Sequence, residues 1–166
     1  MEKTSAPPNI VIVDDAEENL MIMKSVLATE YSLSLFTEAK AALDYAISNP
    51  PDLILLDIMM PGIDGFETCR RIKASPKLAD VPVIFITSKN EDEYEEYGFS
   101  VGASDFIHKP INASILSARV KTHVKIKLII DYLKNENVHL EHDNQKATSE
   151  FTNVLKIICE NPFNKI

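Results

Sequence analysis

Residues 51–62 read PDLILLDIMMPG, and this stretch decides the fold. Its apolar centre, Leu53 to Leu56, is four residues long, and Asp57 and then a proline–glycine pair follow it. A short run in which every residue is apolar is typical of a strand whose two faces are both buried. Strands of this kind occur in parallel sheets that carry helices on both faces, so the stretch predicts an α/β architecture.

Two further runs have the same character, and each follows a proline as the first one does. A fourth candidate strand, Ser32 to Phe36, alternates apolar and polar residues, and a fifth, Asp105 to Ile107, is brief, as edge strands often are. Segments with helical spacing separate all five. This alternation predicts a five-stranded, doubly wound parallel sheet with right-handed crossovers. The two further runs are Ile10 to Val13 and Val83 to Ile86.

Length and composition fit one globular domain with an appendage. The chain has 166 residues, of which 45% are hydrophobic and 25% charged, and this balance excludes wholesale disorder. A net charge of −8 argues against direct nucleic-acid binding. No apolar stretch is long enough to cross a membrane, and the N-terminus has no signal-peptide core. Cys69 and Cys159 are far apart and form neither a disulfide framework nor a zinc motif, so we expect a cytoplasmic protein.

The chain changes character after Pro110. Residues 115–158 contain no proline or glycine, and their first part is expected to close the α/β domain as its fifth helix. A seven-residue repeat then predicts a coiled coil, with asparagine at some core positions, where it sets the register of two-stranded coils. The alternative is an amphipathic helix that packs back on its own domain. Ile126, Leu133, Leu140, Ala147 and Val154 occupy position d, and Ile130, Asn137, Asn144, Phe151 and Ile158 occupy position a.

These patterns predict four segments. We expect an N-terminal tail at 1–8, the α/β domain at 9–125, a helical coiled-coil extension continuous with the fifth helix at 126–160, and a C-terminal tail at 161–166. The extension predicts a homodimer. About forty residues are too few for a typical winged-helix or catalytic domain, so the chain is expected to be a fragment of a larger protein or to act by association.

Polar residues stand at the ends of the predicted strands. Because the carboxyl ends of parallel strands line one crevice, these side chains should converge. Two carboxylates about 5 Å apart repel by roughly 3 kcal/mol at an effective dielectric of 20, and a bound cation offsets this. An all-oxygen site suits Mg²⁺. The residues are Asp14 and Asp15 after the first strand, Asp57 after the third, Thr87 and Ser88 after the fourth, and Lys109 after the fifth.

Two other interpretations of this edge were considered. The acidic pair Asp14-Asp15, taken alone, is also what a helix N-terminus favours, because negative charge there is stabilising. A dinucleotide-binding fold would carry glycines after its first strand, and this loop, residues 14–19, has none. The matching positions of Asp57 and Lys109 favour a shared site.

Four separated motifs resemble the receiver domain of two-component response regulators, over about residues 9–125. The resemblance implies a flavodoxin-like fold with strand order 2-1-3-4-5 and a function in phosphorelay signalling. Its partner would be a histidine kinase or a phosphotransfer protein. The motifs are Val13-Asp14-Asp15, the stretch from Leu56 to Gly65 (LDIMMPGIDG), Ile86-Thr87-Ser88, and the stretch from Gly102 to Pro110 (GASDFIHKP).

The resemblance also implies a role for each site residue. Asp57 would accept the phosphoryl group, and Phe106 would be the aromatic residue that turns inward when the domain switches. The switching surface would be the fourth helix, fifth strand and fifth helix, and the Lys109-Pro110 peptide would be cis. Asp15, Asp57 and the backbone carbonyl of Met59 would ligate Mg²⁺ with help from Asp14, and Thr87 and Lys109 would contact the phosphoryl oxygens.

Such a protein assists its own phosphorylation and dephosphorylation and is not a turnover enzyme. The rival hypothesis is a Mg²⁺-dependent phosphohydrolase that uses Asp57 as its nucleophile, although the following loop carries no acid to activate water. A constitutive scaffold is a further alternative. Met59 and Lys89 would tune the lifetime of the phosphoaspartate, and since neither offers an amide or carboxylate, we expect that lifetime to be long.

The C-terminus is similar to the dimerisation segment of histidine kinases. Ser149-Glu150-Phe151 and, further on, Pro162-Phe163-Asn164-Lys165-Ile166 carry this likeness. Where that family has its phosphorylatable histidine, this chain has Ile157, so the segment is expected to dimerise without accepting phosphate.

Overall fold

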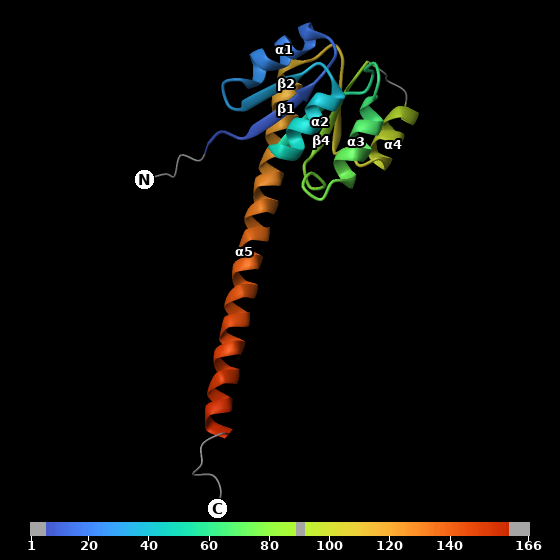
Figure 1. Cartoon of the computed structure of the whole chain (residues 1–166). Coiled ribbons are helices and arrows are strands. Elements are labelled where there is room, and N and C mark those ends of the chain that lie inside the picture. The colour runs from blue at the N-terminus through green and yellow to red at the C-terminus, as the bar shows by residue number, and fades with distance from the viewer. Residues whose placement is uncertain (1–5, 89–91, 160–166) are drawn as a thin grey trace, which may run out of the picture. The chain divides into compact units, whose positions relative to one another are not determined.

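The computed structural model describes residues 6–88 and 92–159, without the side chains of residue 92 and of residues 154–159. Its centre is one parallel sheet of five strands in the order β2-β1-β3-β4-β5, shown in Figure 1. The predicted fold and strand order are confirmed. The strands are β1 (Asn9–Val13), β2 (Ser32–Phe36), β3 (Leu53–Asp57), β4 (Val83–Thr87) and β5 (Asp105–His108).

Helices cover both faces of this sheet. Side chains of β1, β3, β4 and β5 pack against α1 and α5 on one face and against α2, α3 and α4 on the other. Each of α1 to α4 connects two parallel strands, as the alternating pattern in the sequence predicts, and α5 follows the last strand, β5. The helices are α1 (Glu17–Leu27), α2 (Ala39–Ser48), α3 (Gly65–Ala74), α4 (Asp92–Ser100) and α5 (Ala113–Cys159).

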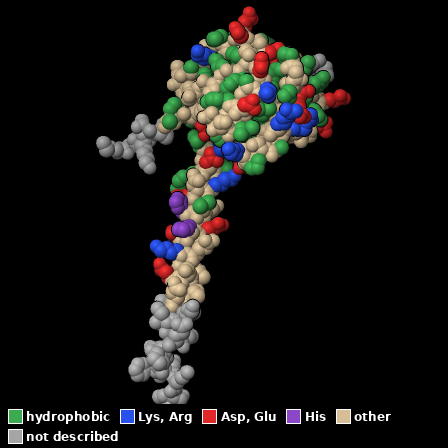
Figure 2. Space-filling model, viewed as in Figure 1, with side chains coloured by type: hydrophobic (Ala, Val, Ile, Leu, Met, Phe, Trp, Pro, Cys, Tyr) green, Lys and Arg blue, Asp and Glu red, His purple; other side chains and the backbone are tan. Residues whose placement is uncertain are grey.

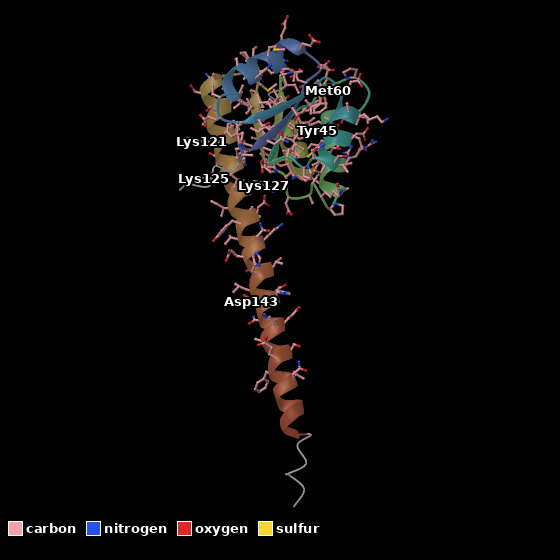
Figure 3. All side chains as sticks on the ribbon, turned by 60° about the vertical axis from the view of Figure 1, so that its left-hand side comes forward. Tyr45, Met60, Lys121, Lys125, Lys127 and Asp143 are labelled. Atoms are coloured by element: carbon pink, nitrogen blue, oxygen red, sulfur yellow. The ribbon has the colours of Figure 1, made fainter. Side chains whose placement is uncertain are left out.

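Burial along the strands follows their place in the sheet. All five residues of β3 and of β4 are buried, because these strands have neighbours on both sides and helices on both faces. β2 is an edge strand, and none of its residues is fully buried. On it, Ser34 donates a hydrogen bond of 2.9 Å to the hydroxyl of Tyr45, which lies on α2 and is labelled in Figure 3. The alternating pattern of residues 32–36 therefore predicted the edge position correctly.

α1 and α3 begin next to the carboxyl end of the sheet, and each has acidic side chains at its N-terminus. The carboxylate of Asp64 caps α3 by accepting the backbone N–H of Glu67 at 2.8 Å. α1 has Glu17 and Glu18 in its first turn, where acidic side chains are stabilised by the partial positive charge of the helix end. Both helix starts therefore anchor the loops that carry the acidic residues.

Contacts divide the chain into two units, and α5 contributes to both. The first unit is residues 1–128 and the second is residues 129–166. In the first unit Leu116, Val120 and Val124 of α5 are buried against the sheet. We call the described part of the second unit, residues 129–159, the extension. No described side chain of the extension is buried, and Figure 2 shows hydrophobic, charged and histidine side chains along its surface.

Within the described residues, no helix combines the length and the apolar character that crossing a bilayer requires. Figure 3 labels three of the lysines of α5, Lys121, Lys125 and Lys127, in a chain whose net charge is −8.

Candidate functional site

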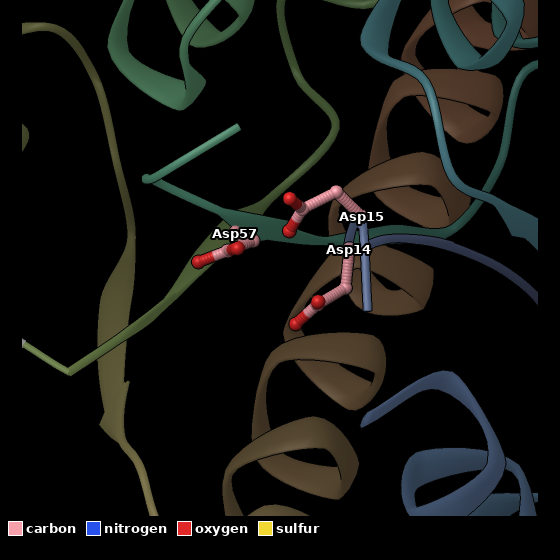
Figure 4. A group of neighbouring side chains, drawn as sticks. All are labelled: Asp14, Asp15 and Asp57. Carbon is pink, nitrogen blue, oxygen red and sulfur yellow. The ribbon is translucent and has the colours of Figure 1, made fainter. Parts of the chain in front are cut away.

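Three carboxylates gather at the carboxyl end of the sheet. Asp14 and Asp15 follow β1, and Asp57 ends β3, so neighbouring strands present all three at the same level. One oxygen of each lies within 4.8 Å of the others, and the three side chains lie close together in Figure 4. Asp14 and Asp57 are 0% and 2% exposed, whereas Asp15 is open to solvent. The predicted convergence of these three acids is confirmed.

Asp14 is held in place by the start of α1. Its Oδ1 accepts the backbone N–H of Ala16 at 2.9 Å, and the side-chain amide of Asn19 donates to Oδ1 at 3.1 Å and to Oδ2 at 3.0 Å. These donors satisfy the buried carboxylate oxygens with hydrogen bonds and fix the orientation of the side chain. The sequence analysis gave Asn19 no role. Its signal was its position, five residues after Asp14 and in the first turn of a helix.

Lys109 joins two of the acids. Its Nζ lies 3.0 Å from Oδ2 of Asp14 and 3.3 Å from Oδ1 of Asp57. Its backbone N–H donates to the carbonyl oxygen of Thr87 at 2.7 Å, which fixes the end of β5 beside the end of β4. The Lys109-Pro110 peptide is cis, as expected.

The charges of this pocket are unbalanced, since three carboxylates face one ammonium. Burial, and then the negative charge of Asp14, raise the pKa of Asp57 to about 6, although Lys109 and the N–H of Met59 oppose the rise. Burial by itself would lower the pKa of Lys109, but its hydrogen bond to Asp14 and the charge of Asp57 raise it overall. The ammonium therefore stays charged while Asp57 is held in a protein environment that disfavours its negative charge.

A small divalent cation fits this pocket. Its donors are carboxylate oxygens of Asp14, Asp15 and Asp57, which are the hard ligands that Mg²⁺ prefers, and the exposed Asp15 leaves one side open to water. A positive ion would relieve the repulsion that raises the pKa of Asp57. An acidic cluster of this composition is typical of the Mg²⁺ sites of receiver domains.

Gly65 lets α3 approach the end of β3. A Cβ at this position would lie 2.4 Å from the carbonyl oxygen of Asp57 and 2.7 Å from Cα of Ile58, distances that no side chain tolerates. The N–H of Gly65 also donates to the carbonyl of Ile58 at 2.9 Å. The main chain around Asp57 is therefore packed directly against the start of α3. The sequence analysis quoted Gly65 in a motif but did not see this packing requirement.

The remaining predicted residues surround the acids. Thr87 ends β4, is 1% exposed, and stands opposite His108 in the β4–β5 register. Met59 is 55% exposed, and its backbone N–H lies 3.4 Å from Oδ1 of Asp57. Phe106 is 4% exposed and lies inside the fold between α4 and the sheet. Lys89 lies outside the described residues.

Asp105 links the amino end of β5 to α5. Its carboxylate pairs with Arg119 and lies 3.0 Å from Nε2 of His123. Burial would raise the pKa of Asp105, but hydrogen bonds from Arg119, the N–H of Phe106 and His123 lower it overall. This cluster holds the first half of α5 at the edge of the sheet.

Comparison with known proteins gives the same family over most of the chain. The profile of the family described as "Response regulator receiver domain" matches residues 10–121. The chain is 41% identical over 126 residues to the response regulator PleD of Caulobacter vibrioides, which covers 75% of this chain and 28% of PleD. It is 39% identical over 141 residues to a Vibrio cholerae protein named "Probable cyclic di-GMP phosphodiesterase", covering 85% of this chain and 32% of that protein.

A solved structure gives the same result. The BeF3-activated receiver domain of DrrB, a Thermotoga maritima OmpR/PhoB homologue, superposes with a TM-score of 0.67 at 31% identity. The match covers 72% of this chain and 98% of that one. The chain spans about a third of the length of the two curated relatives, so what those whole proteins do is not transferred to it.

Proposed function

This chain belongs to the response regulator receiver family, and on that premise we propose that it is switched by a phosphoryl group on Asp57. The observation that carries the proposal is the environment of this carboxylate. Asp57 is buried at the end of β3, beside a second buried acid, with the ammonium of Lys109 at 3.3 Å from its Oδ1. Core packing alone gives no reason to bury two acids side by side.

The proposed reaction is phosphoryl transfer to a carboxylate. An oxygen of Asp57 attacks phosphorus, the bond from phosphorus to the donor breaks, and the donor leaves as a histidine or as the acid of a small phosphodonor. Contacts from Lys109 and from the N–H of Met59 fall on Oδ1, so we assign the attack to Oδ2. Lys109 is placed to neutralise charge on the transferred group.

We propose Mg²⁺ as the cofactor, held by Asp15, Asp57 and the carbonyl of Met59 with help from Asp14. When bound, the ion neutralises charge on the phosphoryl oxygens during transfer. The hydrogen bonds from Ala16 and Asn19 hold the carboxylate of Asp14 in place beside the other acids. Asp15, the exposed member of the group, faces the side from which a phosphodonor would enter.

The phosphoryl group then changes the protein through Thr87, Lys109 and Phe106. It adds close to two negative charges, and new bonds from Thr87 and Lys109 are worth about 1.5–3 kcal/mol each. Moving a two-state equilibrium from 1:99 to 99:1 takes about 5.5 kcal/mol, so two such bonds are nearly sufficient. The surface that responds is α4, β5 and the first half of α5, with Phe106 beneath it.

We propose a histidine kinase or phosphotransfer protein as the donor and a second copy of this chain as the output partner. The extension supports self-association because its heptad residues are exposed, including Leu133 at 54%, Leu140 at 60% and Phe151 at 65%. Asn137 and Asn144 at the a position favour a two-stranded coil in one register. Of the segment resembling histidine kinases, Ser149-Glu150-Phe151 lies in α5, and the part from Pro162 onward lies outside the described residues.

Labelling by a small phosphodonor tests the assignment of Asp57. The chain is incubated with Mg²⁺ and acetyl phosphate, and intact mass reports one added phosphoryl group that hydroxylamine removes. We expect the group on the wild type and on Asp44→Asn, a control on the exposed side of α2, but not on Asp57→Asn. Labelling of Asp57→Asn would overturn the proposal. Rapid multiple turnover of the donor would favour the phosphohydrolase instead.

Solution mass tests the output. Light scattering with and without beryllofluoride and Mg²⁺ should show a dimer that appears or strengthens with the phosphoryl mimic. A dimer of equal strength in both conditions would show that the helix alone sets the oligomeric state. A monomer in both conditions would remove self-association from the proposal.

A further inference from the structure

Gly98 is the one described residue of α4 whose position is fully buried, and it lies directly against Phe106. A Cβ at residue 98 would lie 2.3 Å from Cζ and 3.1 Å from Cε1 of the Phe106 ring. It would also lie 3.2 Å from Cδ2 of Phe85, which is completely buried. The inner face of α4 therefore has room for the Phe106 ring only because residue 98 has no side chain.

The backbone does not explain a glycine here. Among described residues, the glycines with positive φ are Gly62 and Gly102, and Gly98 lies within regular helix. Helix propensity alone favours alanine over glycine at such a position. The glycine is therefore required by what packs against it, and the contact distances identify that neighbour as Phe106.

The buried ring of Phe106 belongs to a row of aromatic side chains. Its centroid lies 5.4 Å from that of Phe85 and 5.0 Å from that of Phe99, which is half exposed on α4. Phe85 is in turn 5.3 Å from Phe66 of α3. In the β4–β5 register Phe85 pairs with Phe106, and Thr87 pairs with His108 one pleat further along the same face. The ring therefore lies beneath α4 and one pleat away from Thr87.

We propose that Gly98 is a positioning residue that determines whether Phe106 can occupy its buried place. A side chain at residue 98 and the inward ring of Phe106 exclude each other, because both would fill the same volume. The contact falls on the far end of the Phe106 side chain, so the ring can yield by turning outward while the strand stays in place. The inference rests on the proposed function, in which inward Phe106 is the signalling position.

In Gly98→Ala we expect phosphorylation of Asp57 to be retained and the inward position of Phe106 to be lost. Residue 98 contacts none of Asp14, Asp15, Asp57 or Lys109, so Asp57 of the variant should still accept a phosphoryl group. The ring of Phe106 should nevertheless be excluded from its buried place, both before and after phosphorylation. Ser100→Ala, on the exposed side of the same helix, is the matched control.

The test follows the Phe106 ring by NMR of ring-labelled phenylalanine, with the Phe106 signals assigned by their loss in Phe106→Leu. In the wild type and in Ser100→Ala we expect cross-peaks between the rings of Phe106 and Phe85 that strengthen with beryllofluoride and Mg²⁺. In Gly98→Ala these cross-peaks should be lost in both conditions. Cross-peaks that persist in Gly98→Ala, or that respond to the mimic as in the wild type, would overturn the inference.

Thermal unfolding separates the ring contact from a general effect on α4. Gly98→Ala should raise Tm more, or lower it less, in a Phe106→Ala background than in the wild type. In that background the Phe106 ring that would clash with the new Cβ is absent, and the higher helix propensity of alanine remains. Equal changes in the two backgrounds would count against the proposal. Acetyl phosphate labelling keeps the two proposals distinguishable. An unlabelled wild type would defeat the proposed function, while the Phe106–Phe85 cross-peaks would still decide the role of Gly98.

Discussion

Leucine side chains in two parts of α5 differ in burial. Leu116, near the start of α5, is completely buried against the sheet, whereas Leu133, in the extension, is 54% exposed. The first unit covers its core with its own helices, and the extension has no sheet beneath it in its own unit. Most of the stability of a helix in a protein comes from packing of its apolar residues, so we expect a partner to stabilise the extension.

The sharpest test of this contrast makes one substitution at both places. Leu116→Ala should lower the free energy of unfolding of the first unit by about 2–5 kcal/mol, because it removes a packed side chain and leaves a cavity. Leu133→Ala should change it by less than about 0.5 kcal/mol, as exposed substitutions do. Urea unfolding followed by circular dichroism measures both. Equal effects would mean that Leu133 also supports the first unit, and the contrast would fail.

Without a cation, we expect the crowded negative charge of the acidic pocket to lower the stability of the first unit. Asp57→Asn should raise the free energy of unfolding by about 2 kcal/mol at pH 7.5 in the presence of a chelator, because it removes a buried charge beside Asp14. Urea unfolding measures the change, with Asp44→Asn as the control. Saturating Mg²⁺ should narrow the difference. A variant less stable than the wild type would show that Lys109 already balances the pocket.

In the extension, a single polar residue should limit self-association. Asn137 stands at a predicted core position, where asparagine specifies register and lowers stability. Asn137→Leu should therefore tighten the dimer by at least about tenfold, equivalent to about 1.4 kcal/mol. Sedimentation over a range of concentrations measures the constant. Asn135→Leu, two residues away on the outer side of the heptad, is the matched control, and an equal gain there would count against the coil.

The exposed apolar side chain of Met59 lies at the edge of the acidic pocket. We expect it to slow hydrolysis of the phosphoaspartate, because it does not orient an attacking water. Met59 is 55% exposed and cannot orient water by a hydrogen bond. Met59→Asn should speed hydrolysis of the phosphoaspartate roughly fivefold, since one hydrogen bond of about 1 kcal/mol changes a rate by that factor. Decay of the labelled protein after removal of the donor gives the rate. Met21→Asn, on the exposed side of α1, should leave it unchanged, and equal decay in all three proteins would refute the hypothesis.

The smallest effect concerns the link that holds the first half of α5. Because the pKa of Asp105 is lowered in the folded state, its ionised form stabilises the fold at pH values above its ordinary pKa. This contribution is lost as the pH falls through the lowered value. Asp105→Asn should cost about 1 kcal/mol at pH 7, and the cost should shrink as the pH falls below about 3.9, the ordinary pKa of an aspartate. Urea unfolding at several pH values checks this, and a constant cost would exclude the ion pair as its cause.

The sheet and the acidic pocket were open to prediction from sequence for one reason. Each central strand is a continuous apolar run, so the first polar residue after it marks the strand end, and in a parallel sheet these ends share one edge. Asp14 and Asp57 stand at such ends, Lys109 follows the edge strand β5, and the structure brings the three together. The site followed from the order of the strands and did not depend on fine detail.

Where the sequence analysis failed, the missing information was how helices pack. On α4 the aromatic Tyr97 is 46% exposed, whereas the neighbouring Gly98 is buried. An aromatic residue signals burial by its hydrophobicity, whereas a glycine gives no such signal. Gly65 was missed for the same reason, because its importance lies in the closeness of Asp57 and not in its own chemistry.

The boundary between the two units falls between residues 128 and 129, inside one uninterrupted helix. An insertion at this point would therefore change the direction in which the side chains after it point around the helix axis. Each residue of an α-helix turns the chain by about 100°, so one inserted residue would face every later side chain in a different direction. Seven inserted residues restore the direction to within about 20°. Insertions at this point, natural or engineered, should therefore be tolerated when they are whole heptads and not when they are single residues.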